Sequence, residues 1–210
     1  MKLSDYSFRD LYKQCLILKS EWVYDGAIKM LSEYAYTAPP GMDAALCFCY
    51  LDTDAGMSFY FLSLAGFESG EIDIASYELQ TAEKLSLRFR YGTDIEVKVY
   101  TKDITCYANR IEMVDTHYHR DESVLPTRNI TAIDHLRNDA YPDDIKVLLR
   151  KDELQIEQVW VKLTGIEDGN LAGVLLNEPH SDFGVNMSDI VHVQVIQRGS
   201  DVYAVCLFPK

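Results

Sequence analysis

The sequence predicts an α+β protein in which an N-terminal helix or helix pair lies on an antiparallel sheet, and a small β-rich domain, barrel-like or a meander, follows. Three features of the pattern support this class. Apolar residues recur at three- and four-residue steps near the N-terminus, as on one face of a helix. Runs that alternate apolar and polar residues follow, as in half-buried strands. Residues 115–129 show neither the helical nor the strand period and form a candidate linker. We expect the boundary between two domains, residues 1–125 and residues 126–210, to fall within it.

The helical pattern runs from Phe8 to about Tyr36. Asp25-Gly26 is a candidate break between two helices. The two prolines of Thr37–Gly41 end the pattern, because proline cannot continue a helix. We expect the apolar face of this segment to pack on a sheet.

Strand patterns fill the rest of the first domain. The turn-rich residues 52–56 connect two apolar runs as a hairpin would, and Tyr91–Asp94 connects a second pair that alternates most clearly. We expect strands at residues 45–51, 57–64, 71–74, 84–91, 95–100 and 105–114.

The second domain begins with a short helix at residues 130–137 and continues with short strands. A longer loop after Asn177 contains Pro179 and Gly184, which oppose regular strand pairing. We expect the strands at residues 145–149, 156–164, 171–176, 190–197 and 202–208, as in a compact sheet or small barrel.

The charge is acidic: 33 Asp and Glu against 20 Lys and Arg give a formal net charge of −13. Nucleic-acid binding is disfavoured, because it requires a basic surface. An acidic balance serves solubility or attracts a basic protein partner. No apolar run reaches the roughly 18–20 residues that span a bilayer. The N-terminus turns charged before an apolar signal core develops, so we expect no membrane association and a cytoplasmic location.

The five cysteines are scattered, and their odd number opposes a disulfide framework. Cys47 and Cys49 would share one face of a strand. They are either a thiol pair available to a metal or free cysteines of the core, and we favour the core.

The segment from Asp115 to Asp121 contains His117 and His119. If it is extended, its carboxylates and imidazoles project on one side, as zinc ligands would. A metal- or small-molecule-binding enzyme that uses His117 and His119 is therefore the alternative function. The sequence has no H-E-x-x-H motif and no paired C-x-x-C, so we favour an exposed histidine pair in a linker and expect no cofactor.

Motifs for catalysis are absent. The sequence has no G-x-S-x-G, G-x-G-x-x-G or Walker-type phosphate loop. The tight carboxylate pair Asp143-Asp144 is interpreted as a turn or helix-end cap. Trp22 and Trp160 are interpreted as core anchors, although Trp160, between Val159 and Val161, could face either side of its strand. Several of the 14 tyrosines lie in polar contexts and favour a binding surface.

Four motifs of the second domain carry a resemblance to a known family. They occur in this order: Y-P-D-D-I-K-V-L-L from Tyr141, V-W-V-K from Val159, L-A-G-V-L-L-N-E-P from Leu171 and M-S-D-I-V-H-V from Met187. Together they span about residues 140–196 and resemble the YegJ-like family of small bacterial domains of unknown function, which look related to domains found among immunity proteins of polymorphic toxin systems. Ser188 stands where the family usually has glycine. The resemblance implies a bacterial, cytoplasmic accessory protein that binds and neutralises a toxin, and it implies no catalytic residue.

The function that we expect is therefore non-enzymatic, toxin-immunity-like binding of a basic, toxin-like protein. The loop after Asn177 is the candidate binding site. Its candidate residues are Glu178, His180, Asp182 and Phe183. Whether the chain is a monomer or a dimer stays open.

Overall fold

The computed structural model describes residues 1–118 and 123–208. The chain divides into two compact units, Met1–Arg120 and Asp121–Lys210. The sequence places the division later, after residue 125, within what the structure shows as the short helix α5 (Leu125–Arg128). An α+β class with a barrel-like second part is confirmed.

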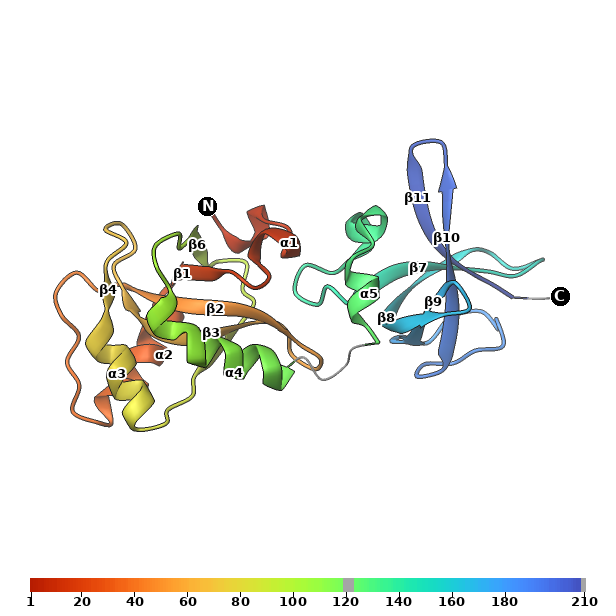
Figure 1. The fold of residues 1–210 in the computed structure, drawn as a ribbon. Coiled ribbons are helices and arrows are strands. Elements are labelled where there is room, and N and C mark those ends of the chain that lie inside the picture. The colour runs from red at the N-terminus through yellow and green to blue at the C-terminus, as the bar shows by residue number, and fades with distance from the viewer. Residues whose placement is uncertain (119–122, 209–210) are drawn as a thin grey trace. The chain divides into compact units, whose positions relative to one another are not determined.

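The first unit is built on a six-stranded antiparallel sheet (Figure 1). Its two longest strands pair along their whole length, and every residue of both is buried. The spatial order is β4 (Ile72–Asp73), β3 (Gly56–Ala65), β2 (Ala44–Asp52), β1 (Cys15–Lys19) and β6 (Glu96–Val99), with β5 (Arg88–Arg90) also paired to β3.

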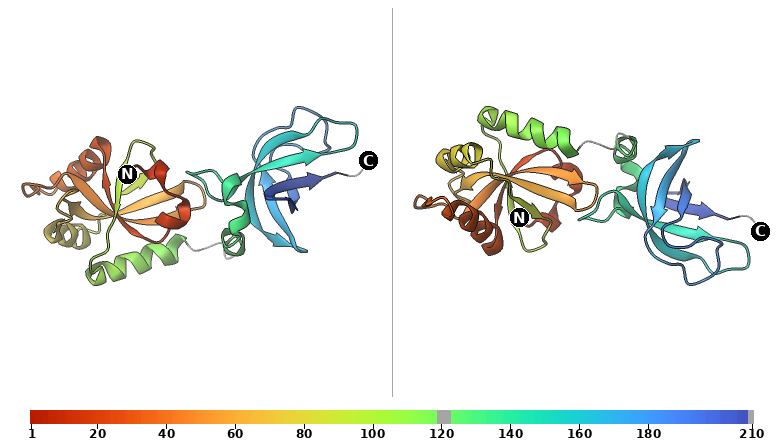
Figure 2. Two further views of the ribbon diagram at one scale, coloured as in Figure 1. Left: turned by 90° about the horizontal axis from the view of Figure 1, so that it is seen from above. Right: turned by 90° about the horizontal axis from the view of Figure 1, so that it is seen from below.

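Helices cover both faces of this sheet, which explains why its central strands have no exposed side (Figure 2). One core layer contains residues of the 3-10 helix Leu3–Asp5, of α1 (Phe8–Leu11) and of α2 (Glu21–Ser32). The opposite layer contains residues of the 3-10 helix Thr105–Tyr107 and of α4 (Ala108–Tyr118), and α3 (Ile74–Ala82) lies against β3.

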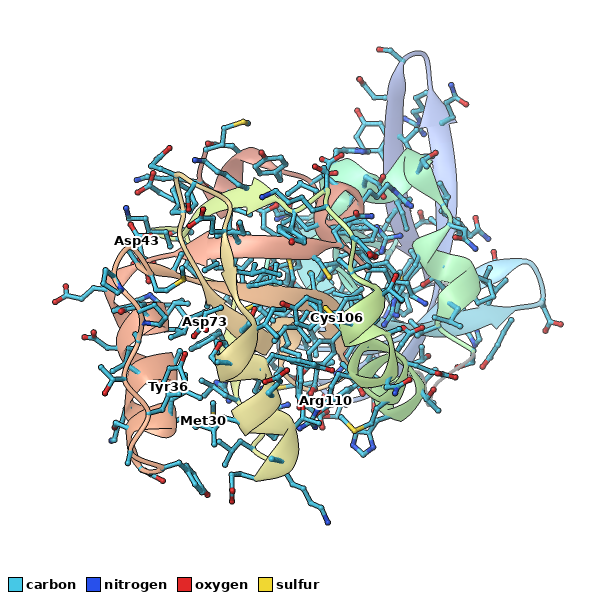
Figure 3. The ribbon with its side chains drawn as sticks, turned by 60° about the vertical axis from the view of Figure 1, so that its left-hand side comes forward. Met30, Tyr36, Asp43, Asp73, Cys106 and Arg110 are labelled. Carbon is cyan, nitrogen blue, oxygen red and sulfur yellow. The ribbon has the colours of Figure 1, made fainter. Side chains whose placement is uncertain are left out.

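Polar contacts fix two of the covering segments (Figure 3). Arg110 of α4 donates to Tyr60 Oη at 3.0 Å and to the carbonyl oxygens of residues 80 and 85 at 3.2 and 3.3 Å. Tyr36, after α2, donates to the Asp73 carboxylate at the start of α3. Hydrogen bonds as well as apolar contacts therefore hold α4 on the sheet and join the segment after α2 to the start of α3.

The predicted helical segment is wrong over Cys15–Lys19, which is the strand β1 between β2 and β6. Four of its five residues are buried because both faces of the sheet are covered, so the strand shows no alternation. Helix at Phe8–Leu11 and the packing of α2's apolar face on the sheet agree with the prediction. The candidate break at Asp25-Gly26 is wrong, because α2 continues through Gly26, and the helix ends at Ser32 rather than near Tyr36.

Three further expectations for this unit are corrected. The strands near residues 84–91 and 95–100 do not form a hairpin, because β5 pairs with β3 and β6 pairs with β1. Residues 105–114 are helical, and the helix continues to Tyr118 in the expected linker. The strand predicted at residues 71–74 is present as β4 but is limited to Ile72–Asp73, because α3 begins at Ile74. The hairpin of β2 and β3 is confirmed.

The second unit is a closed five-stranded barrel (Figure 1). Neighbours along the chain pair antiparallel, and the last strand closes the barrel by pairing parallel with the first. The strands are β7 (Asp144–Arg150), β8 (Glu157–Glu167), β9 (Asn170–Leu175), β10 (Ile190–Arg198) and β11 (Asp201–Leu207). The helix α5 and a 3-10 helix, Thr131–Leu136, precede them.

One face of each barrel strand lines the core and the other faces outward. Alternate residues of β7 and β8 are accordingly buried, in agreement with the predicted strands. Trp160 lies on the outward, half-buried side of β8, with Lys146 Nζ 5.5 Å from its ring, and Trp22 is 42% exposed. The interpretation of both tryptophans as core anchors is therefore wrong. Among the described residues, no helix has the length and apolar character that crossing a membrane requires.

Candidate protein-interaction surface

The loop that the sequence singles out connects β9 to β10 and is closed at its base by backbone hydrogen bonds. Leu175 N donates to Asp189 O at 3.0 Å, and Ser188 N donates to Leu175 O at 2.8 Å. Ser188 has a φ of 77°, in the left-handed region that glycine adopts most readily. A glycine would adopt this backbone conformation with less strain than the serine that stands here.

Carboxylates fix the interior of the loop. Glu157, on β8, accepts hydrogen bonds from the backbone N–H groups of His180 and Ser181 at 2.7 and 2.8 Å. Hydrogen bonding to Ser181 is the main cause that holds the pKa of Glu157 below its ordinary value. This glutamate, more than 20 residues away in sequence, therefore sets the course of the loop.

Two more carboxylates act within the loop itself. Glu178 Oε2 accepts a hydrogen bond from Met187 N at 2.7 Å, which joins the two sides of the loop. Asp182 Oδ1 accepts one from Gly184 N at 3.0 Å, and Asp189 Oδ2 accepts one from Asn186 N at 2.7 Å. In each of these three residues one carboxylate oxygen accepts a backbone hydrogen bond, and the negative charge remains near the surface.

Phe183, one of the four candidate binding residues, is a core residue. It is 2% exposed, it belongs to the barrel core, and its ring lies 5.9 Å from that of Phe208. The apolar side chain in a polar loop thus anchors the loop to the barrel. A partner does not reach Phe183 unless the loop moves, whereas Glu178 and the backbone around His180 are at the surface.

The exposed apolar residues of this region are ones that sequence reasoning missed. Leu176 is 38% exposed, Met187 55% and Ile190 67%. Leu176 N donates to Trp160 O at 2.8 Å, and Ile190 pairs with Val174, so these residues lie at the same end of β8, β9 and β10. We define the acidic loop patch as Leu176, Glu178, Asp182, Met187, Asp189 and Ile190.

The loop sequence itself carries charge of one sign, whereas Lys151 and Lys162 lie beside the acidic loop patch. Lys162 is paired with Val174, which also pairs with Ile190. The sequence from Leu163 to Gln197 contains five acidic residues and no lysine or arginine. The acidic residues therefore give the loop a negative charge, although Lys151 Nζ donates a hydrogen bond to the backbone oxygen of Asp182 at 3.2 Å. Apolar side chains ringed by carboxylates match a partner surface that is apolar and basic.

The expected metal segment is not extended where it is described. Asp115 and His117 belong to the helix α4, so alternate residues do not share a face. Asp115 binds Lys13 Nζ at 2.9 Å, and the ring of His117 lies 4.8 Å from that of Tyr118. His119 lies outside the described residues. Within the described ranges, no three His, Cys, Asp or Glu side chains gather as metal ligands would.

The cysteine pair of the first unit shares a face, as its strand spacing predicts. Cys47 and Cys49 are both 0% exposed and free, and both lie in the core layer beneath α2. Burial raises the pKa of each thiol above its ordinary value, which keeps the sulfur protonated and poorly nucleophilic.

Asp143 has a structural role at the start of the barrel. Asp143 forms a bidentate ion pair with Arg128, with N–O distances of 2.9 and 2.7 Å, and both side chains are nearly buried. Arg137 donates to Pro142 O and Thr127 O at 2.6 and 2.7 Å. The Y-P-D-D motif therefore ties α5 to the first barrel strand, and the interpretation of the pair as a turn cap is wrong for Asp143.

Comparisons with protein-family models, curated proteins and solved structures return no match. The functional conclusion therefore rests on the sequence motifs and on the geometry of the barrel surface.

Proposed function

We propose that this chain is a non-enzymatic protein-binding protein of the toxin-immunity type. It contacts a basic, toxin-like partner in the bacterial cytoplasm through the acidic loop patch. The observation that supports this most is the combination of exposed Leu176, Met187 and Ile190 with carboxylates that the loop already holds in place. The YegJ-like motifs of the second unit contribute the immunity-type assignment.

Preorganisation is the physical reason to prefer this loop over other acidic surface. A loop that is ordered before binding loses little conformational entropy when a partner arrives. Its backbone hydrogen bonds to Glu157, Glu178 and Asp189 provide that order. The carboxylate charges then raise the association rate, and the apolar residues contribute the buried area.

The experiment measures the association of the purified chain with the basic toxin domain encoded beside it, by surface plasmon resonance at several salt concentrations. The triple variant E178Q/D182N/D189N removes three charges, and each amide retains an oxygen that can accept the backbone hydrogen bond. We expect the association rate constant to fall about tenfold at low salt and the difference to shrink at high salt.

A charge-matched control separates this loop from the net charge of the chain. Glu33, Glu83 and Glu112 are exposed residues of the first unit. The variant E33Q/E83Q/E112Q should retain most of the wild-type rate. Equal effects of the two triple variants, or no binding between the wild-type chain and any toxin domain encoded beside it, would contradict the proposal.

A further inference from the structure

A second surface of the barrel has the opposite charge and a hollow of 210 Å³. It lies on the outward side of β7, β10 and β11, where the β10–β11 hairpin extends beyond the other barrel strands (Figure 1). We call it the arginine groove and define it by Leu148, Arg150, Ile156, Arg198, Tyr203 and Leu207.

Strand register explains why these side chains gather. Leu148 pairs with Val205 and Arg150 with Leu207 across the parallel closure of the barrel. Because outward residues alternate with core residues such as Ala204 and Cys206, Tyr203, Val205 and Leu207 share the outer face of β11. The groove is thus a product of the barrel fold and involves no loop rearrangement.

Several apolar side chains of the groove are exposed to solvent. Ile156 is 59% exposed, Leu207 49% and Tyr203 37%. Grouped apolar side chains on the surface of a folded protein are typical of a binding site. The hollow is smaller than the roughly 300–1,000 Å³ of small-molecule pockets, so it suits individual side chains of a docked segment.

The charges of the groove indicate what that segment carries. In the part of the chain that the structure describes, neither Arg150 nor Arg198 makes a side-chain hydrogen bond or ion pair. The second unit has 15 acidic and 8 basic residues, so two guanidinium groups beside one hollow are an uneven distribution, although Asp201 is paired in register with Arg198 and lines the neighbouring hollow. Guanidinium groups bind carboxylates through paired, charge-assisted hydrogen bonds.

The length of the surface favours an extended segment. A neighbouring hollow of 570 Å³ shares Leu148 and Tyr203 with the groove and has Lys146 in its wall. Lys146 and Arg150 are four residues apart on one face of β7, which corresponds to about 13 Å along a strand. A segment of about four or five extended residues spans this distance.

We propose that the arginine groove binds an extended segment of a partner protein in which apolar residues alternate with Asp or Glu. The apolar side chains pack on Leu148, Tyr203 and Leu207, and the carboxylates bind Arg150 and Arg198. This site is separate from the acidic loop patch, because it takes a ligand of the opposite charge and lies on β7, β11 and the Arg198 end of β10, whereas the patch includes Ile190 at the other end of β10.

The test begins with a displayed library of random octapeptides selected on the full chain at physiological salt. Selected peptides should be enriched in Asp or Glu together with Leu, Ile, Val or Phe. Enrichment of basic peptides, or no enrichment over the unselected library, would overturn the proposal.

Two neighbouring charge reversals then locate the site. The best selected peptide, labelled with a fluorophore, is titrated by anisotropy against wild type, R150E and K151E. Both variants change the net charge by the same amount at adjacent positions, but only Arg150 lines the groove. We expect at least a tenfold weaker Kd for R150E and less than a threefold change for K151E.

Further variants keep the result decisive. R198E should match R150E, and E178Q/D182N/D189N should bind the peptide like wild type even if that variant fails to bind a basic partner. Equal affinities of R150E and K151E would overturn the groove as the site. A concentration-dependent dimer in light scattering that I156D abolishes would also overturn the proposal, because the groove would then be occupied by a second copy of the chain.

Discussion

The ion pair of Asp143 with Arg128 joins α5 to the start of the first barrel strand. Both side chains are nearly buried, and the pair is bidentate. Removing the Asp143 carboxylate takes away the bidentate partner of a nearly buried guanidinium, and breaking such a pair costs about 3–5 kcal/mol. We therefore expect D143A to lower the free energy of unfolding of the second unit by that amount, whereas D139A, at an exposed position, should change it by less than about 0.5 kcal/mol.

The measurement is urea unfolding followed by tryptophan fluorescence in a W22F background. The chain has two tryptophans, so Trp160 then reports on the barrel alone. Similar unfolding midpoints for D143A and D139A would show that the ion pair is not needed for stability.

Asp144 gives the chain a pH-dependent stability of defined sign. Burial raises its pKa to about 6, because desolvation of the carboxylate outweighs the lowering effect of Lys162, and Asp143 adds a smaller rise. The folded state therefore holds a proton that the unfolded state has already released above about pH 4. The neutral carboxyl therefore makes its full contribution to the stability of the folded state below about pH 4, and this contribution is lost as the pH rises through about 6.

The variant D144N tests this sign. Asparagine stays neutral, so D144N should unfold at a higher urea concentration than wild type at pH 8, and the difference should disappear near pH 4. The reverse order at pH 8 would mean that the charged form of Asp144, paired with Lys162 across the strands, is the favoured one.

At the scale of single elements, the strand β9 approaches β8 more closely than a side chain permits. A Cβ at Gly173 would lie 2.5 Å from Val161 Cγ1 and 2.6 Å from Lys162 O. Backbone must shift to accommodate it, so G173A should destabilise the barrel by about 1–3 kcal/mol. V174A, on the outward side of the same strand, should cost less than about 1 kcal/mol in the same urea titration. A near-neutral G173A would indicate that the two strands separate easily.

The barrel strands could be predicted closely from sequence because one face of each meets water, which produces alternation. In the first unit, β1 lies beneath helices on both sides, so its buried run lacks alternation and its apolar spacing merges with that of α2. The pattern at residues 84–100 identifies core-facing residues such as Phe89 and Val97 but not the strands that they pair with. Pairing depends on long-range contacts that local sequence does not encode.

The same limit applies to the candidate site. Pro179 and Gly184 locate the loop in the sequence, but the contact with Glu157 decides which side chains point outward. Phe183 is buried and Met187 is exposed for that reason. The arginine groove has no local signal at all, because register brings its residues together from three strands and a turn.

At the scale of the whole molecule, the two units have separate cores. We expect them to unfold in two transitions, one reported by Trp22 in a W160F background and the other by Trp160 in a W22F background. D143A should move only the second transition. Equal shifts of both transitions would show that the units unfold as one cooperative body.

The central claim is that the acidic loop patch receives a basic partner. The most direct measurement is a backbone amide NMR titration of the full chain with a basic, toxin-like domain of the proposed kind. We predict that the largest chemical-shift changes fall on residues 176–190 and that the first unit is unaffected. Changes confined to the first unit, with residues 176–190 unaffected, would contradict the account.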